Sequence, residues 1–573
     1  MKRIAKYLKG YIKESILGPL FKMFEATLEL IVPLVIAAIV DRGILAGDAV
    51  YATKMCVVLL ILGAVGLGFS VTAQYFCAKT AVGFIGKVRY ALFEKMQTLS
   101  YSDIDNLVTS TMITRMTEDA TKVQNGLNLA LRLLLRSPFV VFGAMIMAFT
   151  VDVKSALTFA AVIPLLSIVV FGIMLVTMPL YKRAQKGTDK LLSKTRENLA
   201  GVRVIRAFGN EDEEIDSFKT DNDVLTLIQR RVGRISALMN PLTYVLINVA
   251  ILFLINTGAI QVSAGNLTQG EVVALYNYMS QILVELIKLA NLIISITKAL
   301  ASASRIADML DIQSTENMGA LTIGKDTEVS VEFRNASLTY SGSSEPSLET
   351  MSFAAKKGET IGIIGGTGSG KTTLVNMIPA FYKATSGEVL IYGENVSEYS
   401  PEALRSMIGV VPQNAVLFGG TIRENMLWGN EKATDEEILE ALRKSQAIDI
   451  VEGKGGLDAK IEQGGRNLSG GQKQRLTIAR ALVRNPEILI LDDSASALDY
   501  ATDASLRKEI KKIGGNTTVF IVSQRASSVM HADKIIVLDD GEAVGVGTHG
   551  ELIESCPVYR EIYATQFSEV QNG

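Results

Sequence analysis

A glycine-rich segment in the C-terminal half of the chain carries residue types that bind phosphate groups. It follows an apolar, β-branched stretch at residues 360–364 that is expected to form a strand. The segment reads Gly365, Gly366, Thr367, Gly368, Ser369, Gly370, Lys371, Thr372 and Thr373. Glycines let backbone N–H groups close around phosphate oxygens at a helix N-terminus, while Lys371 neutralises the β- and γ-oxygens and Thr372 offers a hydroxyl to Mg²⁺. The strand–loop–helix context predicts nucleotide binding and leaves hydrolysis open.

Two further segments supply groups for the same chemistry. An apolar strand expected at residues 488–491 ends in Asp492, whose carboxylate can hold the Mg²⁺ hydration shell opposite the phosphate loop. The second segment contains Ser469, Gly470, Gly471 and Gln472. It should open a helix and offer another phosphate site at the helix N-terminus.

In order and spacing these motifs resemble those of the ABC transporter family. Residues 365–372 are similar to its Walker A motif, residues 488–492 to its Walker B motif and residues 468–472 to its signature motif. The resemblance implies ATP and Mg²⁺ as cofactors. It also implies a dimer, because the ATP sites of this family form between the Walker motifs of one subunit and the signature motif of the other.

The resemblance assigns roles to residues that are not distinctive alone. Tyr340 resembles the A-loop aromatic that stacks on adenine, Gln413 resembles the Q-loop glutamine, and residues 496–499 resemble the D-loop. It further implies that Thr372, Gln413 and Asp492 are the residues that hold the metal ion.

Two positions depart from the family pattern where hydrolysis would occur. Asp493 stands in place of the glutamate that polarises the attacking water, and its side chain is one methylene shorter. Gln524 stands in place of the switch histidine and cannot carry a proton near neutral pH. General-base assistance is worth roughly 10² to 10⁴-fold, so we expect Asp493, Gln524 and Gln413 to form a slow catalytic group. The intact signature motif then favours a heterodimer in which this chain completes its partner's active site.

The first 300 residues contain six stretches long and apolar enough to cross a bilayer as helices. They lie near residues 16–40, 55–77, 133–151, 155–179, 237–262 and 271–297. Residues 197–208 are also similar to the long intracellular helix of the family's six-helix exporter domain. We therefore expect an all-α, six-helix membrane domain followed by an α/β P-loop ATPase domain of ABC type. The expected bounds are 1–310 for the membrane domain, 311–328 for a linker and 329–573 for the ATPase domain.

Positive charges predict how the spans are oriented. The connection between the fourth and fifth spans carries many of them, including Lys182, Arg183 and Lys186, whereas the loop at residues 262–270 has none. Lys and Arg favour cytoplasmic loops, so both termini should lie in the cytoplasm and the protein in the cell (inner) membrane. The long connections keep a helical period, for example over residues 185–208, so the spans should continue as helices beyond the bilayer.

Several charged residues fall inside or beside the expected spans. Glu25 and Glu29 share a helix face, which suggests either a cavity for polar or cationic cargo or a packing role. Glu285 and Lys288 are spaced to pair with each other. Arg132 and Arg136, at the start of the third span, are interpreted as anchors at the membrane interface. The sequence leaves open whether Glu25, Glu29, Glu285 or Lys288 contacts cargo.

The net charge of −2 and the isoelectric point near 6.0 argue against a nucleic-acid partner. We expect a subunit of an exporter that moves an amphipathic small molecule, lipid or peptide out of the cytoplasm by ATP-driven alternating access, together with a second half-transporter in the lipid bilayer. Two alternatives remain open. One is a homodimeric exporter with slow ATPase sites, and the other is an ATP-gated regulatory subunit that does not pump.

Overall fold

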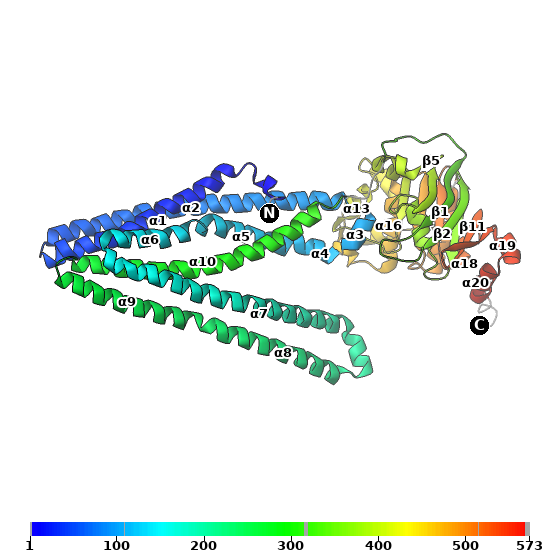
Figure 1. Ribbon diagram of the computed structural model, residues 1–573. Coiled ribbons are helices and arrows are strands. Elements are labelled where there is room, and N and C mark those ends of the chain that lie inside the picture. Colours follow the sequence, from blue (N-terminus) through cyan, green and yellow to red (C-terminus); the bar gives the residue numbers. More distant parts are fainter. Residues whose placement is uncertain (1–2, 108, 314–318, 514, 568–573) are drawn as a thin grey trace. The chain divides into compact units, whose positions relative to one another are not determined.

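The computed structural model describes residues 3–107, 109–313, 319–513 and 515–567 (Figure 1). The chain forms two compact units. One contains residues 1–97 and 110–312, and the other contains residues 98–109 and 313–573. The expected linker, residues 311–328, includes positions 314–318, which lie outside the described residues. Residues 311 and 312 belong to the first unit, whereas residues 319–328 belong to the second. There the N–H groups of Gly319 and Leu321 donate to the carbonyls of Ser397 and Glu398.

Among the described residues of the first unit, six helices are long and apolar enough to cross a membrane. All six expected spans fall within them, which confirms the all-α membrane domain. Their segments are α1 (Ile12–Ala38) with the π-helical turn η2 (Ile39–Leu45), α2 (Ala49–Gln97), α5 (Ala120–Leu133) with α6 (Arg136–Val151), α7 (Val153–Phe208), α8 (Glu211–Ala237) with α9 (Met239–Ser263), and α10 (Gln269–Leu310).

The helices extend well beyond the thickness of a bilayer, as the sequence predicts. At 1.5 Å per residue α7 is about 84 Å long, whereas the hydrocarbon core measures about 30 Å. Asp152 begins α7 by accepting a hydrogen bond from the backbone of Ser155 at 2.7 Å. Gly209, with a left-handed φ of 68°, ends α7 and lets the chain reverse into α8, which packs along it.

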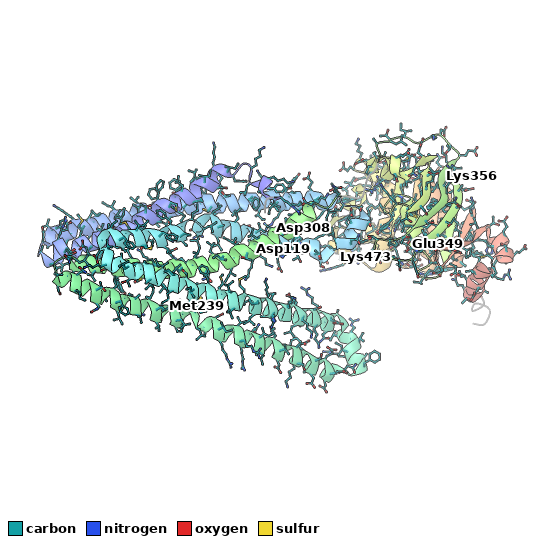
Figure 2. All side chains as sticks on the ribbon, viewed as in Figure 1. Asp119, Met239, Asp308, Glu349, Lys356 and Lys473 are labelled. Atoms are coloured by element: carbon teal, nitrogen blue, oxygen red, sulfur yellow. The ribbon has the colours of Figure 1, made fainter. Side chains whose placement is uncertain are left out.

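Carboxylates from other segments hold both ends of α10. At its start, Asp41 accepts hydrogen bonds from the hydroxyl of Thr268 at 2.6 Å and from the backbone N–H of Gly270 at 2.8 Å. Near its end, the buried carboxylate of Asp119 accepts from Ser302 Oγ and Arg305 Nε, both at 2.9 Å (Figure 2). These contacts fix α10 relative to the first and third spans.

The second unit contains two main sheets. A four-stranded antiparallel sheet has the order β2-β1-β4-β5, and a six-stranded sheet has the order β12-β11-β3-β10-β9-β6, parallel except for β12. The strands are β1 (Val329–Leu338), β2 (Leu348–Lys356), β3 (Thr360–Gly365), β4 (Ser386–Ile391), β5 (Glu394–Asn395), β6 (Ile408–Val411), β9 (Ile488–Asp492), β10 (Thr518–Val522), β11 (Lys534–Asp539) and β12 (Glu542–Gly547). This is the expected α/β ATPase fold.

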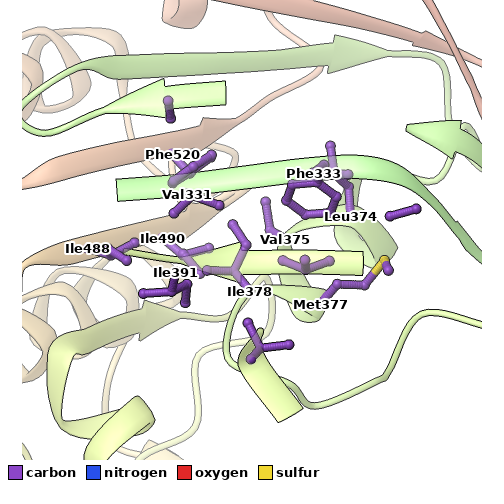
Figure 3. Packing of buried hydrophobic residues seen from close by; sticks show 14 of the residues in the cluster. Val331, Phe333, Leu374, Val375, Met377, Ile378, Ile391, Ile488, Ile490 and Phe520 are labelled. Atoms are coloured by element: carbon purple, nitrogen blue, oxygen red, sulfur yellow. The ribbon is translucent and has the colours of Figure 1, made fainter. Parts of the chain in front are cut away.

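An apolar core joins the two sheets to the helix that follows the glycine-rich loop, α11 (Lys371–Met377). Phe333 and Val331 of β1 pack with Leu374 and Val375 of α11 and with Phe520 of β10 (Figure 3). All five side chains are buried. Burial of this kind contributes about 1.5–3 kcal/mol for a large side chain, so the core holds α11 rigidly behind the phosphate loop.

Candidate nucleotide-binding site

The glycine-rich loop has the backbone geometry that its sequence predicts. It connects β3 to α11, and Gly368 and Gly370 have left-handed φ values of 87° and 91°. A Cβ on Gly370 would lie 2.7 Å from Leu348 Cδ2 and 2.8 Å from the carbonyl oxygen of Ser347. Glycine is therefore required at this position, both for the backbone angle and for the close approach of β2.

Lys371 lies inside the loop that it helps to form. Its ammonium donates to the backbone carbonyls of Gly365, at 3.0 Å, and Gly366, and to Ser369 Oγ at 3.2 Å. Burial lowers the pKa of Lys371, while the nearby carboxylates of Asp493 and Asp492 act in the opposite direction. A buried cation at the N-terminus of α11 attracts polyanions.

Thr372 and Asp492 meet at the edge of the parallel sheet. The Thr372 hydroxyl donates to Asp492 Oδ1 at 3.1 Å, and Asp492 is 5% exposed at the end of β9. Burial raises the pKa of Asp492, and the hydrogen bond from Thr372 opposes this shift. No cluster of three acidic, His or Cys side chains suited to a metal occurs among the described residues. One carboxylate and one hydroxyl are nevertheless sufficient for Mg²⁺, which takes its other ligands from phosphates and water.

The two positions that depart from the family pattern lie in the same cavity. Asp493 has a left-handed φ of 45°, unusual for a non-glycine residue, and its backbone N–H donates to the carbonyl of Val522 at 3.0 Å. Gln413 Nε2 lies 3.4 Å from Asp493 Oδ2. Gln524 lines the cavity from the loop after β10. The structure thus brings Gln413, Asp493 and Gln524 together beside the phosphate loop.

The cavity has a volume of about 340 Å³. Eleven of the predicted residues line it: Tyr340, Thr367, Gly368, Gly370, Lys371, Thr372, Thr373, Gln413, Asp492, Asp493 and Gln524. Ser347 and Val522 line it as well, although no motif in the sequence points to them. The hydroxyl of Tyr340 donates to Thr373 Oγ1 at 3.0 Å, which places its aromatic ring at one side of the cavity. That ring can offer a flat apolar surface to a nucleobase.

The signature segment lies elsewhere in the ATPase unit. Ser469 caps helix α16 (Gly470–Val483): its hydroxyl accepts from the Gln472 backbone at 3.3 Å, and its own backbone donates to Gln472 Oε1 at 3.0 Å. A Cβ on Gly470 would contact nothing within 4 Å. None of residues 469–472 lines the nucleotide cavity. This segment therefore presents an open helix N-terminus that the chain itself does not use.

Helix α3 (Tyr101–Leu107) belongs to the ATPase unit although it lies between the second and third spans in sequence. The ring of Tyr101 stacks on Phe381 with centroids 4.3 Å apart, and Tyr382 donates to Asp105 Oδ2 at 2.5 Å. Tyr382 also meets the ring of Tyr340 edge-on at 5.0 Å. A line of contacts thus connects α3 to the nucleotide cavity, and no motif in the sequence identified it.

The charged residues of the membrane domain form a compensated cluster. Arg136 lies 2.5 Å from Glu29 and 2.7 Å from Glu285, and Lys288 lies 2.8 Å from Glu285, which confirms the predicted 285–288 pair. The interpretation of Arg136 as an interface anchor is wrong, because its side chain is buried between two carboxylates. Glu25 pairs with Lys22 at 2.5 Å. Both carboxylates predicted on α1 are therefore neutralised by a cation.

Comparison with known proteins agrees with this architecture. Residues 15–286 match the family model of the ABC transporter transmembrane region, and residues 348–496 match the family model described as ABC transporter. The chain is 35% identical over 568 residues to an uncharacterized ABC transporter ATP-binding protein, YfiB, of Bacillus subtilis, with 99% of both chains covered.

The chain belongs to the ABC transporter family.

Two other relatives have names that describe a transport role. The chain is 30% identical to a putative multidrug export ATP-binding/permease protein, YgaD, of Bacillus subtilis, with 99% of each chain covered. It is also 30% identical to an ATP-dependent lipid A-core flippase of Hahella chejuensis, over 97% of this chain and 96% of that one. A solved bacterial Atm1-family ABC exporter with ATP bound shares the fold, with a TM-score of 0.78 at 22% identity and 98% of each chain covered.

The family models and the described helices establish the general architecture of this ABC transporter. It is a multi-pass membrane protein with six transmembrane helices, and its ABC domain binds ATP. One membrane domain and one ATPase domain make an exporter half, which acts as an ATP-driven translocase only together with a second half.

Proposed function

We propose that this chain is the degenerate-site subunit of a heterodimeric exporter. It binds Mg²⁺-ATP in its own cavity, hydrolyses it slowly, and completes the active site of a different partner with its signature segment. The observation that carries the proposal is a contrast within one domain. The phosphate loop ends in a cavity with Asp493 and Gln524, whereas Ser469 and Gly470 form a capped and unobstructed helix N-terminus.

Several residues that line the cavity have a role in binding or hydrolysing ATP in this proposal. Tyr340 stacks on adenine, and the loop N–H groups with Lys371 bind the phosphates. Thr372, Asp492 and Gln413 would hold Mg²⁺, which would neutralise charge on the phosphates. Asp493 is held by its hydrogen bond to Gln413 and by its left-handed backbone, and its shorter side chain approaches a water molecule less closely than a glutamate would.

The cargo in this proposal is amphipathic and leaves the cytoplasm. The relatives named for multidrug export and for lipid A-core flipping support a drug-like or lipid-like class. The cationic connection between α7 and α9 and the uncharged loop at residues 262–270 support a cytoplasmic location for both termini in the cell membrane. The contacts from Tyr340 through Tyr382 to α3 offer a route by which nucleotide binding reaches the membrane domain.

The experiment is steady-state ATPase of the complex purified from native membranes with whichever half-transporter accompanies this chain. Lys371→Ala removes a phosphate contact only at the slow site, so a substantial part of the turnover should remain. Gly470→Asp places a carboxylate where the partner's bound γ-phosphate would lie, and this should abolish turnover because like charges repel strongly in a desolvated site. Because nothing lies within 4 Å of a Cβ at Gly470, this substitution leaves the fold of the chain intact.

Three results would contradict the proposal in different ways. Equal damage by Lys371→Ala and Gly470→Asp would identify a homodimer with two equivalent sites. Absence of turnover in the wild-type complex would identify a regulatory subunit. If Asp493→Glu combined with Gln524→His failed to raise turnover in a complex whose partner site is blocked, the assignment of these two residues as the cause of slow hydrolysis would be withdrawn. The expected gain is at least tenfold.

A further inference from the structure

A cavity of about 550 Å³ in the membrane domain lies between α5 and α10. We call it the basic cavity. Its lining consists of Lys122, Asn125, Gly126, Asn128, Leu129 and Arg132 from α5, and Ser295 and Lys298 from α10. Three of these side chains are cations and none is a carboxylate. Two amides and a hydroxyl add neutral hydrogen-bonding groups to the same wall.

Close packing of the two helices creates the cavity. A Cβ on Gly126 would lie 2.1 Å from the Cβ of Ala299, so α5 and α10 touch at this point. Polar residues next to this contact, Asn125 on α5 and Lys298 on α10, line the space beside it. The helices are held together here by the contact between Gly126 and Ala299 rather than by the cations of the cavity.

Two cations of the basic cavity differ from three other cations of the same domain. Arg136, Arg305 and Lys22 each form an ion pair with a buried or half-buried carboxylate. Within the part of the chain that the structure describes, Arg132 and Lys298 form no ion pair, and Arg132 Nε is buried without a hydrogen-bond partner. Lys122 does pair, with Glu118 at 3.1 Å, but both of these side chains are exposed. A buried hydrogen-bond donor without a partner lowers the stability of the fold by about 1–3 kcal/mol. An anionic ligand would remove this penalty by accepting a hydrogen bond from Arg132.

The depth of the cavity indicates what kind of anion it meets. At 1.5 Å per residue, Arg132 lies about 29 Å from the end of α6 at Val151, and Lys298 lies about 44 Å from the start of α10 at Gln269. The hydrocarbon core is about 30 Å thick. The basic cavity therefore begins near the edge of the hydrocarbon core, at Arg132, and extends from there through the polar layer of one leaflet, which is the cytoplasmic leaflet in the orientation proposed above.

We propose that the basic cavity binds the anionic headgroup of an amphiphile, such as a phosphate or carboxylate whose chains remain in the bilayer. Arg132 and Lys298 contact the anion, and Asn125, Asn128 and Ser295 bind its neutral oxygens. The assignment of the basic cavity to the cytoplasmic leaflet rests on the proposed export function. Binding of the headgroup itself requires neither ATP nor a partner chain.

The test uses the full-length chain in nanodiscs of phosphatidylcholine that contain a minor fraction of phosphatidylglycerol. Native mass spectrometry would count the phosphatidylglycerol molecules that the released protein retains. Arg132→Gln and Lys298→Gln should each lower retention about threefold to tenfold, while Arg132→Lys should keep most of it. The matched control is Arg183→Gln, because this exposed residue of α7 lies at a similar depth, about 45 Å from Val153, outside the cavity. All variants must still elute as monodisperse protein after detergent extraction, which reports on the fold of the membrane domain.

The following outcomes decide whether the basic cavity binds a headgroup and what kind of lipid occupies it. Retention unchanged in both Gln variants, or lowered equally by Arg183→Gln, would overturn the proposal. Displacement of the lipid by inorganic phosphate at millimolar concentration would also overturn it, since the ligand would then be a free anion. If short-chain phosphatidylglycerol stimulates ATPase of the partner complex and Arg132→Gln removes this effect, the occupant is cargo; if only retention changes, it is a resident lipid. If the basic cavity bound no headgroup, Lys371→Ala and Gly470→Asp would still differ in their effect on ATPase activity. The proposed function would then stand without the headgroup site.

Discussion

Tyr382 of the ATPase domain donates a hydrogen bond to Asp105 of α3 across 277 positions of the chain, at 2.5 Å. Tyr382 also contacts Tyr340, so a single side chain joins the nucleotide cavity to a helix that the sequence places between two membrane spans. The hydroxyl makes one of these contacts and the ring makes the other. They can therefore be separated by mutation.

We expect Tyr382→Phe to retain ATP binding and lose its effect on α3. The ring contact to Tyr340 remains, whereas the hydrogen bond to the Asp105 carboxylate disappears, a loss of about 1 kcal/mol or more. Hydrogen exchange of the full-length chain should show ATP still protecting residues 365–373 but protecting residues 98–109 severalfold less than in wild type. Tyr563→Phe is the control, since this phenol lies in α20 (Pro557–Phe567), away from the nucleotide cavity. Equal protection of residues 98–109 in Tyr382→Phe and wild type would show that the hydrogen bond transmits nothing.

The Asp492 carboxylate should make the stability of the ATPase domain depend on pH. Because burial raises its pKa, the folded state binds a proton more tightly than the unfolded state. The ionised carboxylate therefore destabilises the fold at neutral pH, and this effect disappears as the pH falls through the raised pKa towards the ordinary value near 4.

Asp492→Asn should accordingly raise the melting temperature of the nucleotide-free protein at pH 7.5. Each kcal/mol gained in the free energy of unfolding corresponds to about 2–4 °C. The increase should be smaller at pH 5. The same variant should lose most of the further stabilisation that Mg²⁺-ATP gives to wild type, because a metal-binding oxygen is gone. Thermal unfolding of the full chain at both pH values provides the measurement. The exposed control Asp540→Asn should change neither value. A destabilised Asp492→Asn at pH 7.5 would contradict the expected sign.

The ion cluster around Arg136 should be essential for the folded membrane domain. Arg136→Gln leaves Glu285, which is 3% exposed, without its nearest buried cation, and breaking a buried pair costs about 3–5 kcal/mol. The yield of monodisperse protein after detergent extraction should fall sharply. The double variant Arg136→Gln/Glu285→Gln should recover part of it, because the uncompensated charge is removed. Lys288→Gln is the control, since this more exposed partner should matter little. An Arg136→Gln yield equal to that of Lys288→Gln would disprove a central role for the cluster.

The features that could be predicted from the sequence are those with short-range requirements. A phosphate loop needs its glycines, Lys371 and Thr372 within one strand–loop–helix unit, so residues 360–373 revealed it directly. A membrane span needs a continuous apolar run, and all six were found. The helix that begins after Ser469 followed from the same kind of local pattern.

The features that could not be predicted depend on partners far apart in the chain. Arg136 appeared to be an interface residue because Glu29 and Glu285 lie 107 and 149 positions away. The association of α3 with the ATPase unit depends on Tyr382 and Phe381, which no periodicity connects to residues 98–109. Pairing of charges and rings across such separations is decided by packing rather than by local pattern.

The hydrogen bonds from Thr268 and Gly270 to Asp41 have a consequence for how the membrane domain is made. They join the end of the first span to the start of the sixth, and Tyr278 of the sixth span donates to the carbonyl of Leu30 in the first at 2.7 Å. A ribosome delivers these two spans at opposite ends of the synthesis of this domain. The first span must therefore wait in the bilayer, with Asp41 lacking its final hydrogen-bond donors, until the sixth span has left the insertion machinery.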